Sequence, residues 1–149
     1  PLGKGEVLRA GNDVTILAAG TMVAPAMEAA QRLSGNGIES TVINARFVKP
    51  LDSQLILDTA MMTGRVVTIE ENTLLGGFGS AVLQLLQNSA VQGIEIKCIG
   101  LPDVFVEHGP QSLLRSKYHL DAQGITEQIL TSFPELAACY NLSARRASQ

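Results

Sequence analysis

The sequence predicts a three-layer α/β/α protein: a five-stranded, mostly parallel sheet with one antiparallel edge strand and helices on both faces. Short runs rich in Val, Ile and Thr alternate with segments whose apolar residues recur at helical spacing. The runs are nearly continuous, which is typical of strands covered on both faces. The alternation repeats roughly every 25–30 residues, as right-handed βαβ units do.

The first two strands are expected at residues 7–9 and 13–19, separated by a Gly-Asn turn. Parallel neighbours need a crossover of a dozen residues or more, and this link is far shorter. We therefore expect residues 7–9 to form the antiparallel edge strand and residues 13–19, DVTILAA, to form a core strand.

The first helix is expected to begin after Thr21, a side chain suited to capping free helix N–H groups. Pro25 falls in its first turn, where a missing N–H costs little. The sequence Gly-Asn-Gly at residues 35–37 ends the helix, and a β-branched strand follows at residues 38–45.

The remaining elements follow the same alternation. We expect helices at 53–62, 78–90, 110–117 and 123–132, and strands at 65–69 and 94–99. Asp52 is suited to capping the first of these helices, and Gly64 to ending it.

We expect one domain over residues 1–136, a length that buries a sizeable core. Periodicity is lost after Pro134, and residues 137–149 are expected to be a disordered tail. The chain begins with Pro1 rather than Met, which suggests a fragment of a longer protein.

Composition restricts the classes of function. The net charge is −3 with no basic run, which disfavours nucleic-acid binding. No apolar run is long enough for a membrane span, and no signal peptide is visible. Two cysteines without metal-ligand spacing favour a reduced, cytoplasmic protein with no metal site.

The stretch VVTIEENTLLGGFGSAV, residues 66–82, suggests two kinds of site. Gly76, Gly77, Phe78 and Gly79 precede or open a helix, where free N–H groups favour an anion. The spacing matches neither GxGxxG nor a P-loop, so we favour packing or an interface over phosphate binding.

Glu70 and Glu71 close a parallel strand in the same stretch. Adjacent strand residues point to opposite faces, so at most one of the two carboxylates is a catalytic candidate. We favour a structural role, in which one glutamate pairs with Arg46 or Arg65 and the other faces solvent or a partner.

The histidines and cysteines provide no catalytic set. His108 is a candidate acid or base by its ordinary pKa range, but we favour a structural role in which it holds its loop by hydrogen bonds. We expect His119 at the surface and Cys98 as a small buried residue within an apolar strand.

Five stretches occur in order: LGKGEVLRAGNDVTILAAGTMVAPAMEAA, INARFVKPLD, VVTIEENTLLGGFGSAVLQLL, GLPDVFVEHGPQSLL and LDAQGI. Together they resemble the C-terminal domain of the 1-deoxy-D-xylulose-5-phosphate synthases of the transketolase family. The resemblance implies a five-stranded mixed sheet. It also implies an intact enzyme that uses thiamine diphosphate and Mg²⁺ to join pyruvate to glyceraldehyde 3-phosphate, releasing CO₂.

In that family the GDG…N cofactor signature and the activating glutamate lie in the first two domains. Neither is present here, so we carry over no catalytic, cofactor-binding or metal-binding residue. The resemblance implies that this fragment binds no cofactor, packs on the other domains and contributes to a homodimer. Alternatives are the same domain of a 2-oxoacid dehydrogenase β subunit or another transketolase-family protein, or a regulatory domain that binds a small molecule.

The expected contact surface consists of the loops at 46–51, 70–79 and 101–109. The candidate contact residues are Arg46, Glu70, Glu71, Asn72, Gly76, Gly77, Phe78 and His108. Phe78 opens a helix beside this surface, so Phe78→Asp is expected to weaken docking and leave the fold intact.

Overall fold

The computed structural model describes residues 1–147 and contains one five-stranded sheet with strand order β1-β3-β2-β4-β5. β1 is antiparallel to β3, and the other neighbouring strands are parallel. This confirms the predicted fold class and the antiparallel edge strand. The strands are β1 (Glu6–Arg9), β2 (Val14–Ala18), β3 (Ser40–Asn44), β4 (Arg65–Thr73) and β5 (Glu95–Leu101).

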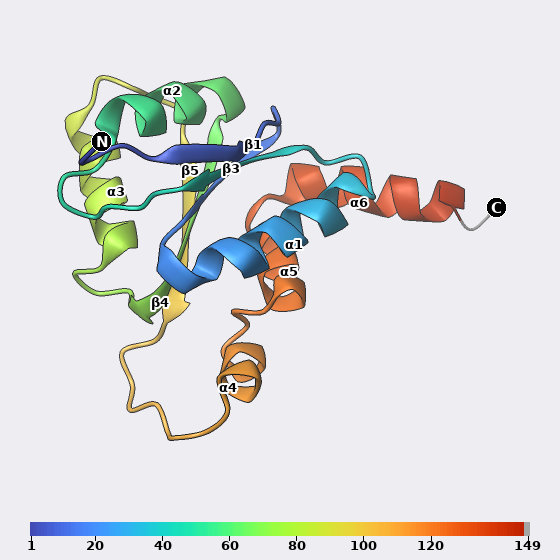
Figure 1. Ribbon diagram of the computed structural model, residues 1–149. Helices are drawn as coiled ribbons and strands as arrows, with labels where there is room; N and C mark the ends of the chain where they lie inside the picture. Colours follow the sequence, from blue (N-terminus) through green and yellow to red (C-terminus); the bar gives the residue numbers. More distant parts are fainter. Residues whose placement is uncertain (148–149) are drawn as a thin grey trace.

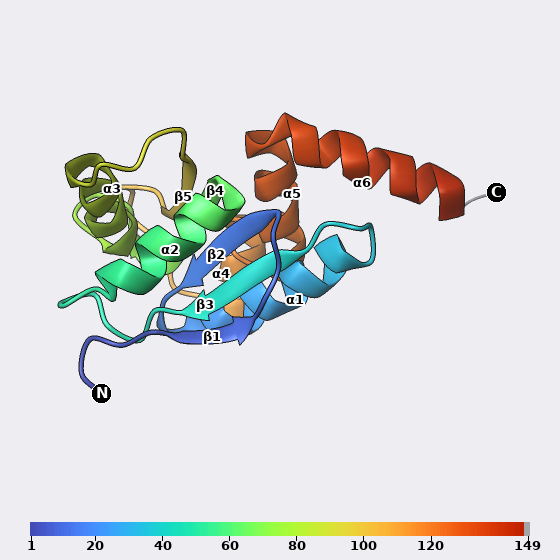
Figure 2. The same cartoon turned by 90° about the horizontal axis from the view of Figure 1, so that it is seen from above.

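Helices cover both faces of this sheet, with α2 and α3 on one side and α1 and α5 on the other (Figure 1; Figure 2). The helices are η1 (Gly20–Met22), α1 (Val23–Ser34), α2 (Ser53–Thr63), α3 (Phe78–Asn88), α4 (Gln111–Lys117), α5 (Ala122–Ser132) and α6 (Pro134–Ala147). α4 and the loop before it project beyond the end of β5 in Figure 1.

The core consists of two apolar clusters, one on each face of the sheet. Ile16 and Val67 belong to the cluster under α1 and α5, whereas their neighbours Leu17 and Val66 belong to the cluster under α2 and α3. Successive strand side chains point to opposite faces, so an unbroken apolar run supplies both clusters.

The helix starts agree with expectation at α2 but not at α1. The Asp52 carboxylate accepts from the Leu55 N–H at 3.3 Å, and Gly64 follows α2 with φ +70°. The prediction that Thr21 caps the first helix is wrong. A 3₁₀ turn precedes α1, neither start has a side-chain cap, and the Thr21 hydroxyl bonds Glu71 instead.

The carboxyl-terminal segment also differs from expectation. Residues 137–149 were expected to be a disordered tail, but α6 extends over Pro134–Ala147, and residues 148–149 lie outside the described part. Pro suits the first helical position, and buried Leu136 joins the core in the first turn. The following stretch is rich in Ala, Leu and Arg, which favour helix. The boundary expected at residue 136 therefore falls inside a helix.

Candidate functional site

Strand β4 places the two adjacent glutamates on opposite faces of the sheet, as predicted. β4 continues to Thr73, so both glutamates lie within the strand rather than in the loop after it. Glu70 is fully buried, whereas the Glu71 side chain is 28% exposed. The two carboxylates therefore belong to separate environments.

Glu70 caps helix α3. Its Oε2 accepts from the Phe78 N–H at 2.8 Å, and its Oε1 accepts from the Gly79 N–H at 2.9 Å. These are the first two residues of α3, whose N-cap residue Gly77 supplies no side-chain bond. A buried carboxylate thus occupies the position where the helix dipole and free N–H groups favour an anion.

The glycine loop is shaped around this carboxylate. A Cβ on Gly77 would lie 2.3 Å from the Glu70 Oε2 and 2.7 Å from the Thr73 carbonyl oxygen. Gly76 has φ +70°, which favours glycine. A phosphate at this helix start would need the same N–H groups that Glu70 already accepts from. The N–H groups at this helix start are therefore occupied, and tight packing, which we favoured over phosphate binding, is the reason for Gly77.

Glu71 links its own strand, β4, to η1 and α4 at the carboxyl end of the sheet. Its two oxygens accept from Arg115 Nε at 3.2 Å and Nη2 at 3.1 Å, a bidentate arrangement. Thr21 donates to it at 2.6 Å and Gln111 at 3.3 Å. The hydrogen bonds from Arg115 are the largest cause that lowers the pKa of Glu71.

The predicted arginine partners of the glutamates are wrong. Arg65 pairs with Glu135 and donates to the Asp13 carbonyl at 3.2 Å. Arg46 lies in an exposed turn at φ +59°, where its N–H bonds the Asn44 side chain at 3.1 Å. The sequence did not predict Arg115 as the partner of Glu71, because the position of Arg115 depends on how α4 folds back onto the sheet.

A cleft of about 410 Å³ opens at the carboxyl ends of β2, β3 and β4. It brings together three predicted contact residues, Arg46, Glu71 and Asn72, with Thr21 and Phe47 beside them. Open α/β sheets tend to bind ligands at this end. Glu71 is already engaged by Arg115 and Thr21, and the residues lining the cleft include no Ser, Cys, Lys or His, so they form no catalytic set.

Phe78 does not lie at the surface. It is 2% exposed and packs in the cluster that contains Leu17, Ile43 and Val82. The interpretation of Phe78 as an interface residue is therefore wrong. Phe78 was placed at an interface because it begins a helix, but its ring points inward under α3.

The other predicted residues lie apart from this cleft. His108 is exposed, and within residues 1–147 its side chain makes no hydrogen bond, so it does not hold its loop as expected. That loop is held by Glu107, which pairs with Lys117. Cys98 is half-buried in β5, and His119 is exposed as predicted.

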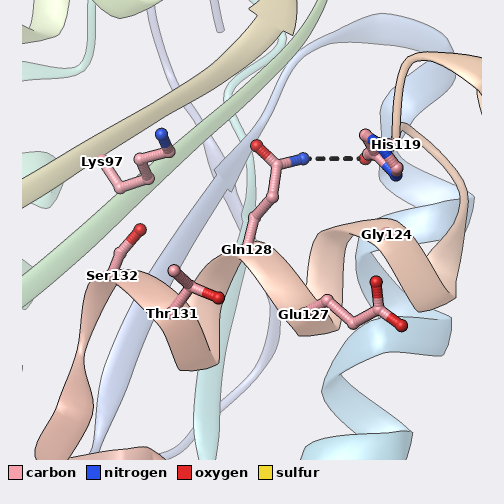
Figure 3. A pocket seen from close by; sticks show the side chains of 7 residues that line it. All are labelled: Lys97, His119, Gly124, Glu127, Gln128, Thr131 and Ser132. Carbon is pink, nitrogen blue, oxygen red and sulfur yellow. Dashed lines mark hydrogen bonds between the residues drawn. The ribbon is translucent and has the colours of Figure 1, made fainter.

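A second hollow of about 220 Å³ lies between β5 and α5 (Figure 3). Lys97, Gln128 and Ser132 border it, and Gln128 donates to the His119 carbonyl at 2.9 Å. Sequence patterns did not predict this groove, because it depends on the spacing between a strand and a helix. Gly124 borders the hollow, and a Cβ there would lie 2.5 Å from the His119 Cα.

The described residues do not form a site for thiamine diphosphate or Mg²⁺, the cofactors that the resemblance implies for the intact enzyme. Within residues 1–147 there is no group of three or more His, Cys, Asp or Glu side chains that could hold a metal ion. The helix-start amides that suit a diphosphate are bonded to Glu70. Among the same residues, no helix is long and apolar enough to cross a membrane.

The fold and a family comparison define the class of protein. Residues 3–125 match the family described as "Transketolase, C-terminal domain", and the chain belongs to this family. This confirms the resemblance seen in the sequence.

Curated relatives make the similarity more specific. The chain is 52% identical over 131 residues to 1-deoxy-D-xylulose-5-phosphate synthase 1 of Geobacter metallireducens, covering 88% of the chain and 21% of that protein. It is 55% identical over 125 residues to synthase 1 of Geobacter sulfurreducens, covering 84% of the chain and 20% of that protein. The chain thus spans about a fifth of the length of these relatives.

Solved structures agree with this assignment. A "Split gene transketolase, inactive beta4 tetramer" superposes with a TM-score of 0.82 at 40% identity, covering 89% of the chain and 43% of that protein. A transketolase from Pichia stipitis superposes with a TM-score of 0.59 at 19% identity over 87% of the chain and 18% of that protein, which shows the fold alone.

Proposed function

We propose that the chain is the C-terminal domain of a 1-deoxy-D-xylulose-5-phosphate synthase. The intact enzyme would use thiamine diphosphate and Mg²⁺ to join pyruvate to glyceraldehyde 3-phosphate with release of CO₂. One observation carries this proposal: the chain is more than half identical to such synthases over more than four fifths of its length.

Within that enzyme the domain would serve interdomain packing and homodimer formation in the cytoplasm, without a catalytic set of its own. The engaged state of Glu71 and the filled anion position at α3 support this role, because neither leaves a group free for chemistry. Contacts to the other domains would involve residues from the carboxyl-end loops: Arg46, Glu71, Asn72, Gly76, Gly77 and His108.

The alternatives are less well supported. A regulatory domain that binds a phosphorylated ligand at the glycine loop would need N–H groups that Glu70 occupies. The 2-oxoacid dehydrogenase β subunit remains distinguishable by the residues that precede Pro1, because a synthase carries its cofactor domain on the same chain.

The test compares the 149-residue chain with the intact protein encoded by its gene. We expect the intact protein to form 1-deoxy-D-xylulose 5-phosphate from pyruvate and glyceraldehyde 3-phosphate only when thiamine diphosphate and Mg²⁺ are added. We expect the purified chain to release no CO₂ from pyruvate under the same conditions. Turnover by the chain would contradict the accessory role, and an inactive intact protein would contradict the enzyme assignment.

A further inference from the structure

Five of the eleven large exposed apolar side chains lie on segments that follow strands at the carboxyl end of the sheet. They come from the connections that follow β3, β4 and β5 and from α4. We call them the carboxyl-end apolar surface: Val48, Leu75, Val104, Phe105 and Leu113. Parallel strands bring these segments to one edge of the molecule. Scattered apolar residues are ordinary, so the most exposed of them, Phe105, is the strongest candidate for a binding contact.

Phe105 is the most exposed member of this surface. Its side chain is 89% exposed, on the loop that projects with α4 beyond the body of the domain (Figure 1). Its neighbour Val104 is 59% exposed. An aromatic ring that nothing in the domain covers is the type of side chain that anchors protein interfaces when it enters a pocket.

The segment that carries Phe105 is fixed at its base. Glu71 of β4 holds Arg115 of α4, and Glu107 of the loop pairs with Lys117. Residues 111 and 115 share the face of α4 that meets Glu71, so Leu113, which is 66% exposed, points to the opposite side. A surface held in place before binding loses less conformational freedom on association.

The charges beside Phe105 indicate the chemistry of the partner. Glu107, Arg115 and Lys117 are already paired within the domain. Among the side chains that the structure describes, those of residues 1–140 and 146, Asp103 has no ion-pair partner and no hydrogen-bond partner, although it lies two positions from Phe105. An apolar ring next to an unpaired acid fits an apolar pocket with Lys or Arg at its rim.

We propose that the carboxyl-end apolar surface docks onto another domain of the same enzyme, with Phe105 inserted into an apolar pocket whose rim carries a basic residue opposite Asp103. The inference rests on the proposed function, under which this chain is about a fifth of the protein. A domain on the same polypeptide is held at high effective concentration. A second copy is less suitable, because a two-fold contact centred on this loop would place Asp103 against its own equivalent.

Side-chain oxidation by hydroxyl radicals tests the docking surface. Phe105 should be oxidised rapidly in the isolated chain and roughly tenfold more slowly in the intact enzyme, as its exposure falls from 89% to that of a buried anchor. Met61 and Met62 are about half exposed near the end of α2, at the opposite end of the sheet, and serve as internal references. Their oxidation should be the same in both proteins.

A pair of variants separates docking from folding. Phe105→Ser should lower the melting temperature of the intact enzyme and leave that of the isolated chain unchanged, while Met61→Ser should change neither. Equal oxidation of Phe105 in both proteins overturns the proposal. Protection that grows with the concentration of the isolated chain also overturns it, because the occupant is then a second copy.

The synthase assay keeps the two proposals distinguishable. An active synthase with unprotected Phe105 contradicts the docking surface and leaves the proposed function standing. An intact protein without synthase activity, but with protected Phe105, contradicts the proposed function and supports docking onto another domain of the same chain.

Discussion

Glu70 and Glu71 are neighbours in β4, yet they have different roles because successive strand side chains point to opposite faces of the sheet. Glu70 is buried and accepts only from backbone N–H groups at the start of α3. Glu71, one residue later, faces Arg115, Gln111 and Thr21 at the surface. A buried carboxylate is tolerated when hydrogen bonds and a helix dipole replace its water. Glu70 thus serves as the side-chain cap of α3.

Replacing Glu70 tests this role directly. Glu70→Gln exchanges one acceptor oxygen for an NH₂ group that faces a backbone N–H. We expect the free energy of unfolding to fall by about 1–3 kcal/mol, because one buried backbone N–H loses its acceptor and faces an NH₂ group. Urea denaturation measures this change. Glu28→Gln, an exposed position on α1, is the control and should change little; equal midpoints for the two variants would contradict the capping role.

The sequence predicted part of this residue-scale arrangement. Alternation along β4 indicated that the glutamates diverge, since that depends only on neighbouring positions. The partners were not predictable in the same way. The Phe78 and Gly79 amides come from the chain's return into α3, and Arg115 lies 44 residues from Glu71. The first contact depends on the fold of the short glycine loop between β4 and α3, and the second on the packing of a distant segment.

At the scale of elements, local capping was predictable and distant capping was not. Asp52 lies next to the helix it caps, so its sequence position was sufficient. α3 is capped from β4 instead, and no residue beside its first turn indicates this. Thr21 had the right residue type but bonds Glu71, since a 3₁₀ turn moves the start of α1 beyond it. The helical course of residues 134–147 follows from an anchor in the core that periodicity alone did not show.

Helix α4 is held to the sheet by Glu71, and this attachment should depend on pH. The hydrogen bonds from Arg115 lower the pKa of Glu71 below its ordinary value of 4.5. The stabilisation is therefore fully present above about pH 4.5 and lost as pH falls through the lowered pKa of the folded state. Glu71→Gln should cost about 1 kcal/mol at neutral pH and remove this part of the acid dependence.

The measurement is the free energy of unfolding of both proteins at several pH values from 7 down to about 3, a span that covers ordinary carboxyl titration. Other carboxylates with lowered pKa, such as Glu39 and Glu107, contribute equally to both curves. The difference between the curves should therefore shrink below about pH 4.5. A constant difference down to the lowest pH would show that the ionisation of Glu71 does not stabilise the fold.

At the scale of the whole molecule, the sequence predicted the three layers because the burial of apolar strand residues requires helices on both faces of the sheet. Continuous apolar strands need cover on both faces, and the two core clusters provide it. The cleft at the carboxyl end follows from strand direction and was expected as a contact surface. The hollow between β5 and α5 was not predicted, because its width depends on how the helix packs (Figure 3).

Phe78 is the residue at which a core role and a surface role predict the most different effects of a substitution. Its ring is 2% exposed in the cluster under α2 and α3, so Phe78→Asp places a charge among Leu17, Ile43 and Val82, close to the buried Glu70 carboxylate. Loss of the ring alone costs about 3–5 kcal/mol, and burying an unpaired charge adds to this. Domains of this size are stable by only about 5–15 kcal/mol, so we expect the variant to be largely unfolded.

Leu83→Asp is the matched control, because Leu83 lies on the same helix but is 39% exposed. Far-ultraviolet circular dichroism and urea denaturation of the isolated chain measure both variants. We expect Leu83→Asp to retain the native spectrum with a midpoint close to that of the parent chain, while Phe78→Asp loses its cooperative transition. If Phe78→Asp instead remains folded with an unchanged midpoint, then the packing of α3 against β4 and β5 is not what holds this face of the sheet together.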